Sequence, residues 1–449
     1  MFCKVSQQYI AIAIFAAVYA LIIIGRTRRY RIPIWVSMLI GAFLMIVFQV
    51  IGLEAAFKSI NLDVIGFLFG MFSIVTALDK SGVLRLVAIK MLSRANSPDS
   101  LLLIFVVGMG ILSAFLVNDT IALLGIPLIV YISKQVGIRP LVLLIALAFG
   151  ISVGSTMTPI GNPQNLLIAI QSGISLPFIT FVVHLTIPTL FNLFSTYFIL
   201  RMYFKKDLVL LNGTRYREIS HDSHTIAATP LNHEAISPII ENPRLAKISS
   251  AILLITIAGF IISEFLHFLH IASVGLSVIA LLDAGALYLV SGSDRKDILR
   301  RVDYSVLVFF AAMFVVTSAL WSSGAISMIM SHIPSPNPNN IFQSNAVISA
   351  VSILLSQILS NVPFVALYNF VMLNNGFGGD AHVSQWMMLA SASTIAGNLT
   401  ILGAASNIII IDVAESKNLK AFTFVEFLKI GTLVTLTNIG IYYLFITYL

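Results

Sequence analysis

The sequence predicts an all-α polytopic membrane protein built from two inverted repeats, each with five spans, one re-entrant hairpin and interrupted helices at the bilayer midplane. Three observations predict this fold. Of the 449 residues, 58% are hydrophobic and only 10% are charged, whereas soluble domains carry about 25% charged residues. Apolar runs long enough to span a bilayer recur along the whole chain. Polar motifs of the first half also recur in the second half at a nearly constant spacing.

The composition excludes several classes of protein. The single cysteine, Cys3, rules out a disulfide framework and a cysteine-ligated metal site. Long unbroken apolar runs favour helices over a closed barrel. The net charge of +7 would suit a nucleic-acid partner, but 24 of the 26 Lys and Arg residues lie on or beside one predicted membrane face. We therefore expect a surrounding lipid bilayer, no nucleic-acid partner and no cofactor.

The predicted spans follow one another as apolar stretches of about 20 residues, the length that crosses a bilayer. Two further apolar segments break in the middle at polar tips, and we interpret them as re-entrant hairpins that enter from opposite sides. The ten predicted spans are residues 9–25, 33–51, 63–79, 139–171, 177–201, 248–266, 272–291, 303–321, 386–416 and 421–447, and the hairpins are residues 100–135 and 344–374.

Charge placement predicts the orientation. Arg26, Arg28, Arg29 and Arg31 directly follow the first apolar run, and the positive-inside rule places them in the cytoplasm. The N-terminus is then outside, and the even number of crossings brings the C-terminus outside as well. The same order argues against a cleaved signal peptide, in which positive residues precede the apolar core. We expect a multi-pass protein of the bacterial inner membrane.

The longest polar stretch divides the chain into three parts. Residues 1–203 and 248–449 form the two repeats, and residues 204–247 form a cytoplasmic linker rich in Lys and Arg. His221, His224 and His233 in the linker fit no compact metal-ligand spacing. We interpret the linker as a solvated loop.

The internal repeat is visible in the polar residues that the two halves share. Chance easily matches Leu with Leu in an apolar chain, but it explains matched Asn, Thr and Gly poorly. Because each half has an odd number of crossings, the second half is an upside-down copy of the first, which is the architecture of secondary transporters. The matched pairs, at shifts of 242 or 243 residues, include Asn118 with Asn361, Thr158 with Thr400, Gly161 with Gly403 and Asn165 with Asn407.

The candidate site consists of four polar breaks, the two hairpin tips and the two interrupted helices. Broken backbone at membrane depth is tolerated where it lines a cavity or binds an ion, and the tip and break of each half should meet near the midplane. Helix N-termini suit an anion, whereas unwound carbonyl groups suit a cation. The candidate binding residues are Asn118, Asp119, Thr120, Thr158, Asn162 and Asn165 in the first half and Ser360, Asn361, Thr400, Ser406 and Asn407 in the second.

Asp119 is the only acidic residue at a predicted break. A carboxylate at membrane depth is by default a proton or sodium site, so the expected coupling ion is a proton or sodium. The alternative is structural, because Asn118-Asp119-Thr120 is also good capping chemistry for the helix that follows. The two roles are compatible. In the same way, any single Ser, Thr or Asn in the set could serve only to satisfy the broken backbone.

The order of an Asn-containing tip and a Thr-x-x-Gly-x-x-x-Asn break, repeated once, resembles the ion transporter superfamily of divalent anion/sodium symporters, citrate-type carriers, arsenite permeases and sodium/proton antiporters. Asn118-Asp119 is similar to the arsenite-permease tip, and residues 161–165 are similar to bacterial anion permeases. The dicarboxylate symporters have Ser-Asn-Thr at both tips, whereas Val362 follows Ser360-Asn361 here. At the first tip, Asp119 stands between Asn118 and Thr120. A Thr hydroxyl is thus missing from one tip and a negative charge has entered the other, which favours proton coupling through Asp119. The resemblance also implies sodium at the same tips and a homodimer.

The sequence therefore predicts a secondary transporter that moves small anions, either di- or tricarboxylates or inorganic oxyanions, under a proton or sodium gradient. An arsenite efflux permease and a sodium/proton antiporter are alternatives of the same class. An intramembrane enzyme that uses Asp119 as acid or base is the alternative from another class. The chain has no HExxH, Gly-x-Ser-x-Gly or aspartate-rich diphosphate motif, so we do not expect an enzyme.

Overall fold

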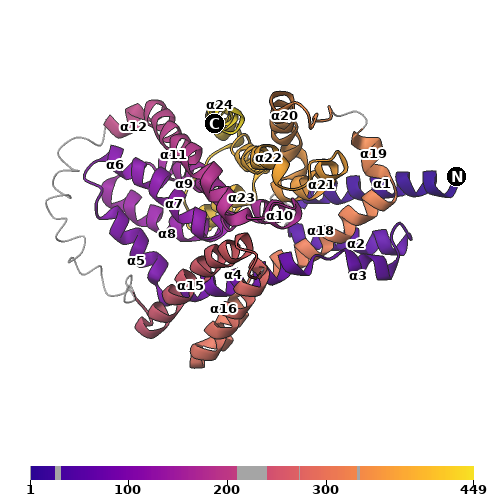
Figure 1. Cartoon of the computed structure of the whole chain (residues 1–449). Coiled ribbons are helices and arrows are strands. Elements are labelled where there is room, and N and C mark those ends of the chain that lie inside the picture. Colours follow the sequence, from indigo (N-terminus) through magenta and orange to yellow (C-terminus); the bar gives the residue numbers. More distant parts are fainter. Residues whose placement is uncertain (1, 26–31, 210–239, 273, 331–333, 449) are drawn as a thin grey trace.

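The computed structural model describes residues 2–25, 32–209, 240–272, 274–330 and 334–448. Every regular element in these ranges is a helix, so the all-α prediction is confirmed (Figure 1). The elements of the first half are α1 (Phe2–Gly25), α2 (Ile34–Val47), α3 (Leu53–Ser59), α4 (Leu62–Ser81), α5 (Val83–Leu92), α6 (Pro98–Leu103), η1 (Ile104–Gly108), α7 (Met109–Phe115), α8 (Asn118–Val136), α9 (Pro140–Gly154), η2 (Ser155–Met157), α10 (Pro163–Gln171), α11 (Pro177–Tyr203) and α12 (Lys205–Val209). Those of the second half are α15 (Pro243–Phe268), α16 (Leu276–Val290), η3 (Gly292–Asp294), α17 (Arg295–Arg301), α18 (Tyr304–Ser322), α19 (Ala325–Met330), α20 (Ile341–Leu359), α21 (Asn361–Asn374), η4 (Asp380–His382), α22 (Val383–Ala396), η5 (Ile401–Gly403), α23 (Ala405–Ser416) and α24 (Phe424–Tyr448).

Two predicted features fall outside the described residues. Residues 210–239 make up most of the predicted linker and contain its three histidines. Residues 26–31 contain the arginines that predict the orientation of the first span. The linker and the placement of both termini outside the cytoplasm therefore stay predictions.

The described chain has eight helices long and apolar enough to cross a membrane, or nine if α16 and the segment Gly292–Arg301 (η3 and α17), bent by 119° from each other, count as one span. Shorter apolar stretches lie at Gln7–Ile22 and Ile34–Val47. The chain is thus a multi-pass membrane protein. The predicted spans 139–171 and 386–416 are broken, as expected, into α9 with α10 and α22 with α23.

The predicted hairpins correspond to α6–α8 and α20–α21. Their first arms, Pro98–Phe115 and Ile341–Leu359, are among the eight helices that could cross by length. Length alone therefore does not separate a re-entrant arm from a span. The hairpin interpretation and the count of ten crossings stay predictions.

The helices pack as two groups. In the first, which we call the α4 group (α1–α4 and α15–α18), α4 packs on α15 and α16, and α2 packs on α1 and α18. In the second, the α9 group (α6–α11 and α20–α24), α9 packs on α7 and α8, α22 packs on α20, and α11 packs on α24. Figure 1 shows α15 and α16 beside α4, on the other side of the molecule from α24.

Burial follows this arrangement. Nearly all residues of α9 and α22 are buried, whereas large apolar side chains such as Phe198 on α11 and Leu254 on α15 are exposed, as expected beside lipid. Helices in the centre approach closely because they meet at small residues, which is typical of membrane proteins. A Cβ atom at Gly154 of α9 would collide with the backbone of Gly110 on α7.

Helices at matched positions in the two halves make matched contacts. α2 packs on α18 as α16 packs on α4, and α8 packs on α23 as α21 packs on α10. Ser152 and Thr394, 242 residues apart, touch through a 3.3 Å hydrogen bond from Ser152 Oγ to the carbonyl of Thr394. Asn192 Nδ2 donates to the Asn438 carbonyl at 3.3 Å where α11 meets α24. These contacts support the predicted repeat. The opposite orientation of its halves and the domain boundaries stay predictions.

Candidate functional site

Both hairpin tips face one cavity of 720 Å³ that lies between the α4 group and the α9 group. Asp119 and Thr120 of the first tip and Ser360 of the second tip line it directly. Pro163 and Ala405, the first residues of α10 and α23, line it as well. Tips and breaks from both halves therefore converge on one space, large enough for a small ligand.

Four helices begin at this cavity. They are α8 and α21, which start at the hairpin tips, and α10 and α23, which follow the two breaks. A helix N-terminus presents unpaired N–H groups and a partial positive charge. The four N-termini thus favour an anion without a basic side chain at the tips. Among the described lining residues, Arg301 at the end of α17 is the single Lys or Arg.

In the first half, hydrogen bonds join the tip to the break. The N–H of Asn118 donates to the carbonyl of Gly161 at 3.0 Å. The hydroxyl of Thr158 donates to the carbonyl of Ala114 near the end of α7, and it accepts the N–H of Gly161 at 3.2 Å. Asn118 Oδ1 is buried and has no partner among the described residues. Tip and break therefore meet as predicted, with one amide oxygen left open.

The two asparagines of the first break satisfy its backbone. Asn165 Nδ2 lies 3.3 Å from each of the carbonyl oxygens of Ser155, Thr156 and Thr158. Asn162 Oδ1 accepts the N–H of Asn165 at 2.9 Å and so caps α10. Asn162 Nδ2 donates to the carbonyl of Ser155 at 3.2 Å. Asn162 and Asn165 therefore satisfy the broken backbone, which is the structural role that the sequence analysis gave as the alternative to ligand binding.

In the second half the matched residues make fewer bonds. Asn361 Oδ1, Ser406 Oγ and Asn407 Oδ1 are buried and have no hydrogen-bond partner among the described residues. Asn407 Nδ2 donates to the carbonyl of Gly397 at 2.8 Å, so the amide is oriented with its oxygen free. Amide and hydroxyl oxygens are ligands that hard cations accept. The second half therefore offers open oxygen ligands behind its tip.

The backbone of the second tip is strained. Ser360 has φ 66° and ψ 160°, a region that is essentially restricted to glycine and costs about 1–3 kcal/mol for other residues. Val117, which precedes α8 at the first tip, has ordinary angles of φ −47° and ψ 130°. The Ser360 hydroxyl donates to the carbonyl of Gly403 in the second break at 3.5 Å. Such strain is concentrated at ligand sites.

Asp119 is the charged group at the tips. Its side chain faces the cavity, and within the described chain its carboxylate has no hydrogen bond or ion pair. The other charged residues that line the cavity are Asp79, Arg301 and Asp303. A carboxylate without a protein partner is free to bind a proton or a cation from the cavity.

Two polar residues that the sequence reasoning did not select lie in or beside the breaks of the second half. Asn398 is fully buried, and neither atom of its side-chain amide has a partner among the described residues. Gln357 at the end of α20 accepts the hydroxyl hydrogen of Thr400 at 2.8 Å. A search for identical residues in the two repeats does not find them. The residue 242 positions before Asn398 is Thr156, and the residue 243 positions before Gln357 is Ala114. A search for polar residues on either side of each break would find them.

Thr394 is a third residue that the sequence reasoning missed, and it joins the two halves. Its Oγ1 lies 3.3 Å from Asn162 Nδ2 and 3.4 Å from Gln164 Nε2, and it donates to Asn165 Oδ1 at 3.3 Å. Its matched residue is Ser152, another hydroxyl. The first break is therefore held in part by a side chain of the second half.

Several similar proteins are named as transporters. An uncharacterized transporter of Mycobacterium bovis is 29% identical over 443 residues, which cover 97% of each chain. The silicon efflux transporter of Oryza sativa subsp. japonica is 29% identical over 447 residues, which cover 90% of each chain. The P protein of Homo sapiens is 26% identical over 506 residues, which cover 99% of this chain and 60% of that protein.

Among solved structures, the Alcanivorax borkumensis YdaH transporter aligns with a TM-score of 0.49 and 14% identity over 90% of this chain and 88% of that one. The profile of the citrate transporter family matches residues 19–392. This match confirms the resemblance to the ion transporter superfamily. It identifies the chain as a transporter and rules out the alternative of an intramembrane enzyme. The chain is a membrane transporter and belongs to the citrate transporter family.

Proposed function

We propose that this protein is a secondary active transporter of small anions, either di- or tricarboxylates or inorganic oxyanions, driven by a proton or sodium gradient. The observation that carries the proposal is the convergence of four helix N-termini on the 720 Å³ cavity. Backbone N–H groups and the helix dipoles bind an anion there without a buried basic side chain. Thr120 and Ser360, which line the cavity, add hydroxyl donors.

The coupling cation has two candidate positions. The open oxygens of Asn361, Asn398, Ser406 and Asn407 suit sodium, because unwound segments and amide oxygens coordinate this ion in transporters. The free carboxylate of Asp119 suits a proton or sodium. The transport experiment below, with a proton gradient or a sodium gradient, distinguishes a proton from sodium as the coupling ion.

Asp119 supplies a physical reason for coupling. The ionised carboxylate repels an anion in the same cavity, and two charges 4 Å apart interact by roughly 4 kcal/mol at an effective dielectric of about 20. Binding of a proton or a sodium ion at Asp119 removes this repulsion. The affinity for the anion then depends on the cation, and the reverse is also true, which is the thermodynamic requirement for coupled transport.

A second candidate substrate is a small neutral hydroxide such as silicic or arsenous acid. The described hairpin tips contain no Lys or Arg, which favours it, and Arg301 on α17 is the single basic residue among the described lining residues. The similarity to the rice silicon efflux transporter points to the same class. Hydroxyl and amide groups hydrogen-bond a neutral hydroxide as readily as an oxyanion.

Flux through proteoliposomes tests the proposal. Citrate, succinate, sulfate, arsenite and silicic acid are offered one at a time under a proton gradient or a sodium gradient. We expect an anion to accumulate with one gradient and to lose this accumulation in Asp119→Asn. Transport of a neutral hydroxide without any anion would select the second candidate. Exchange of sodium for protons without movement of any substrate would contradict both.

Asp303→Asn is a matched control for this experiment. Asp303 lines the same cavity, and its carboxylate caps α18 by accepting the N–H of Ser305 at 3.0 Å. Because Asn caps helices about as well as Asp, the variant removes a cavity carboxylate and keeps the fold. We expect Asp303→Asn to keep gradient-driven uptake. Equal loss in both variants would show that the total charge of the cavity matters and not Asp119 itself.

A further inference from the structure

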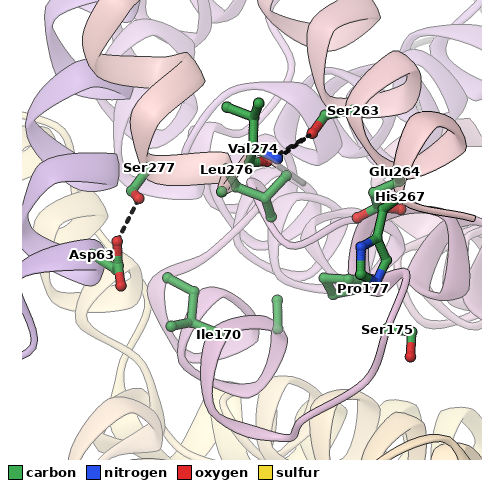
Figure 2. Close-up of a pocket in the computed structure, with 12 residues that line it drawn as sticks. Asp63, Ile170, Ser175, Pro177, Ser263, Glu264, His267, Val274, Leu276 and Ser277 are labelled. Carbon is green, nitrogen blue, oxygen red and sulfur yellow. Dashed lines mark hydrogen bonds between the residues drawn. The ribbon is translucent and has the colours of Figure 1, made fainter. Parts of the chain in front are cut away.

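A second, smaller pocket lies at the other end of α4. It has a volume of 220 Å³, and Asp63, Glu264 and His267 contribute its ionisable side chains (Figure 2). Asp63 belongs to the first turn of α4, whereas Asp79 near the end of the same helix lines the large cavity. Because 16 residues of α-helix rise about 24 Å, the two openings are far apart along the helix.

The walls of the two openings correspond through the internal repeat. Four residues of the small pocket lie 242 positions from residues that line the large cavity, and 242 is the shift that relates the two breaks. The matched pairs are Ile22 with Glu264, Ile34 with Leu276, Trp35 with Ser277 and Ser305 with Asp63. The internal repeat therefore relates the small pocket to the large cavity.

Both openings also lie between the same two helix groups. Asp63, Glu264 and Ser277 belong to the α4 group. Ile170 and Pro177, at the end of α10 and the start of α11, belong to the α9 group. Figure 2 shows Ile170 and Pro177 across the pocket from the residues of α16. A movement of one group past the other would widen one opening and narrow the other.

A buried carboxylate joins the two groups at the small pocket. Glu264 on α15 is only 5% exposed, and its two oxygens accept the N–H of Phe178 at 2.6 Å and of Ile179 at 2.8 Å. Both N–H groups are in the first turn of α11, where an anion is favoured by the helix dipole. α15 packs on α4 and α16, whereas α11 packs on α24 and α9. The two bonds therefore hold the groups together.

The large cavity lacks this link. The residue matched to Glu264 is Ile22, which has no acceptor in its side chain. The helix matched to α11 is α24, and it is capped by its own neighbours, because Thr423 Oγ1 accepts the N–H of Glu426 at 3.3 Å and the Glu426 carboxylate accepts the N–H of Thr423 at 2.9 Å. The carboxylate link is thus present at the 220 Å³ pocket and replaced by an apolar side chain at the 720 Å³ cavity.

We propose that the small pocket is the second mouth of the transport path, closed in this structure, and that Glu264 is the positioning residue that keeps it closed. The inference rests on the proposed function in one respect, namely that the chain alternates between two open sides. Breaking the two bonds to α11 releases the groups from each other at this mouth. The population then shifts towards the state in which the small pocket is open and the large cavity is closed.

Cysteine labelling from each membrane face tests this proposal. Cys3→Ser removes the one native thiol, and Ile34→Cys and Leu276→Cys then serve as matched reporters at the large cavity and the small pocket. We expect a membrane-impermeant maleimide to label Ile34→Cys quickly and Leu276→Cys slowly. Adding Glu264→Ala should raise the rate at position 276 and lower the rate at position 34, shifting their ratio by about tenfold or more, as for loss of a charge-assisted hydrogen bond.

Ser263→Ala is the control variant. Ser263 lines the same pocket, but its hydroxyl bonds the carbonyl of Val274 at 2.7 Å, within the α4 group. We expect it to leave both rates unchanged. Faster labelling at both reporters in Glu264→Ala would indicate general loosening and would overturn the proposal, as would unchanged rates at both.

Glu264→Gln keeps one acceptor oxygen and should give an intermediate ratio. It also tests the proposal if Glu264→Ala does not fold. A wild-type ratio of labelling rates in a folded Glu264→Gln variant would show that Glu264 does not keep the small pocket closed. Labelling requires neither a substrate nor a gradient. The failure of the anion assay and the failure of this inference are therefore separate results.

Discussion

In the first half the amide nitrogens of Asn162 and Asn165 contact backbone carbonyls of the break, whereas in the second half Asn361 Oδ1 and Asn407 Oδ1 have no partner among the described residues. The matched pair Asn165 and Asn407 differs at the amide oxygen, because Asn165 Oδ1 accepts the hydroxyl hydrogen of Thr394 at 3.3 Å and Asn407 Oδ1 has no partner among the described residues. A buried polar group without a partner costs about 1–3 kcal/mol. Asn118 Oδ1 of the first half-site is also such a group, but the second half-site contains more of them, so a bound ion would offset a larger unfavourable free energy there.

The two tips also differ in charge. Asp119 of the first tip corresponds to Val362 of the second, 243 residues later. The first tip thus contributes a carboxylate, and the second contributes neutral oxygens and the strained backbone of Ser360. A repeat supplies the symmetric framework of two tips and two breaks, but the ligands within it are unequal. This comparison predicts that matched substitutions in the two halves have unmatched effects.

The largest expected effect comes from the charge at the first tip. Asp119→Asn should lower gradient-driven uptake by about 100-fold, the upper range of coupling energies between sites. Adding Val362→Asp restores a carboxylate at the matched position of the second tip. We expect uptake to stay low, because the surroundings of the two tips differ. Recovery of uptake in the double variant, measured in proteoliposomes, would show that the tips are interchangeable.

The next effect separates a structural asparagine from a binding asparagine. Asn165→Ala leaves the carbonyls of Ser155, Thr156 and Thr158 without their donor, so it should lower the free energy of unfolding by about 2–3 kcal/mol. Asn398→Ala removes an amide with no partner among the described residues. It should leave stability within about 1 kcal/mol and lower the apparent cation affinity about tenfold, as for one lost ligand bond.

Thermal unfolding in detergent and uptake at graded cation concentrations measure the two effects. Asn165→Ala should move the melting temperature, and Asn398→Ala should move the cation dependence. If Asn398→Ala were as destabilising as Asn165→Ala, then both breaks would be structural and the contrast between the half-sites would be wrong.

Sequence reasoning predicted the positions of the hairpins and breaks because polar interruptions in apolar runs are local signals. It did not predict which half would satisfy its own backbone, because that depends on neighbours. Thr158 donates to the carbonyl of Ala114, whereas Thr400 donates to the side chain of Gln357. Two identical threonines thus have different partners, and the difference arises from a residue about 43 positions away in each half.

Glu264 shows a second limit of the sequence reasoning. It lies near the end of a predicted span, where a charged residue usually faces water. Nothing in the sequence near Glu264 indicates that α11 begins beside it, because Phe178 is 86 residues away. Polar contacts between distant helices depend on how the helices pack, and the local hydrophobic periodicity of a sequence does not predict that packing. The same reasoning applies to Thr394, which bonds a break 232 residues earlier.

A smaller effect tests the strain at the second tip. Ser360→Gly should raise the free energy of unfolding by about 1 kcal/mol, because glycine tolerates a positive φ. Val117→Gly, the matched change at the first tip, should lower it by about 0.5–1 kcal/mol through added freedom of the unfolded chain. Opposite shifts of the melting temperature would support the comparison. Shifts of the same sign would show that the Ser360 backbone is not strained.

The smallest expected effect concerns a contact between the halves beside the closed pocket. The N–H and hydroxyl of Ser175, before α11, donate to the carboxylate of Asp380, before α22, at 2.9 and 2.5 Å. The hydroxyl bond, followed by the N–H bond, lowers the pKa of Asp380. A lowered pKa in the folded state stabilises the protein above the unfolded value of about 3.9, and this stabilisation is lost as the pH falls through the folded value.

Asp380→Asn should therefore lower the melting temperature at pH 7 and have little effect at a pH below the folded-state pKa of Asp380, where the wild-type carboxylate is protonated. Asp380 is exposed, so screening by water keeps the difference below about 1 kcal/mol. Ser175→Ala removes the hydroxyl bond and should show a weaker form of the same pH dependence. A deficit of equal size at both pH values would mean that Asp380 acts through its shape and not its charge. The contact would then be a neutral hydrogen bond between the two connections, and the carboxylates of Glu264 and Asp63 would be the charged groups that join the two halves at the small pocket.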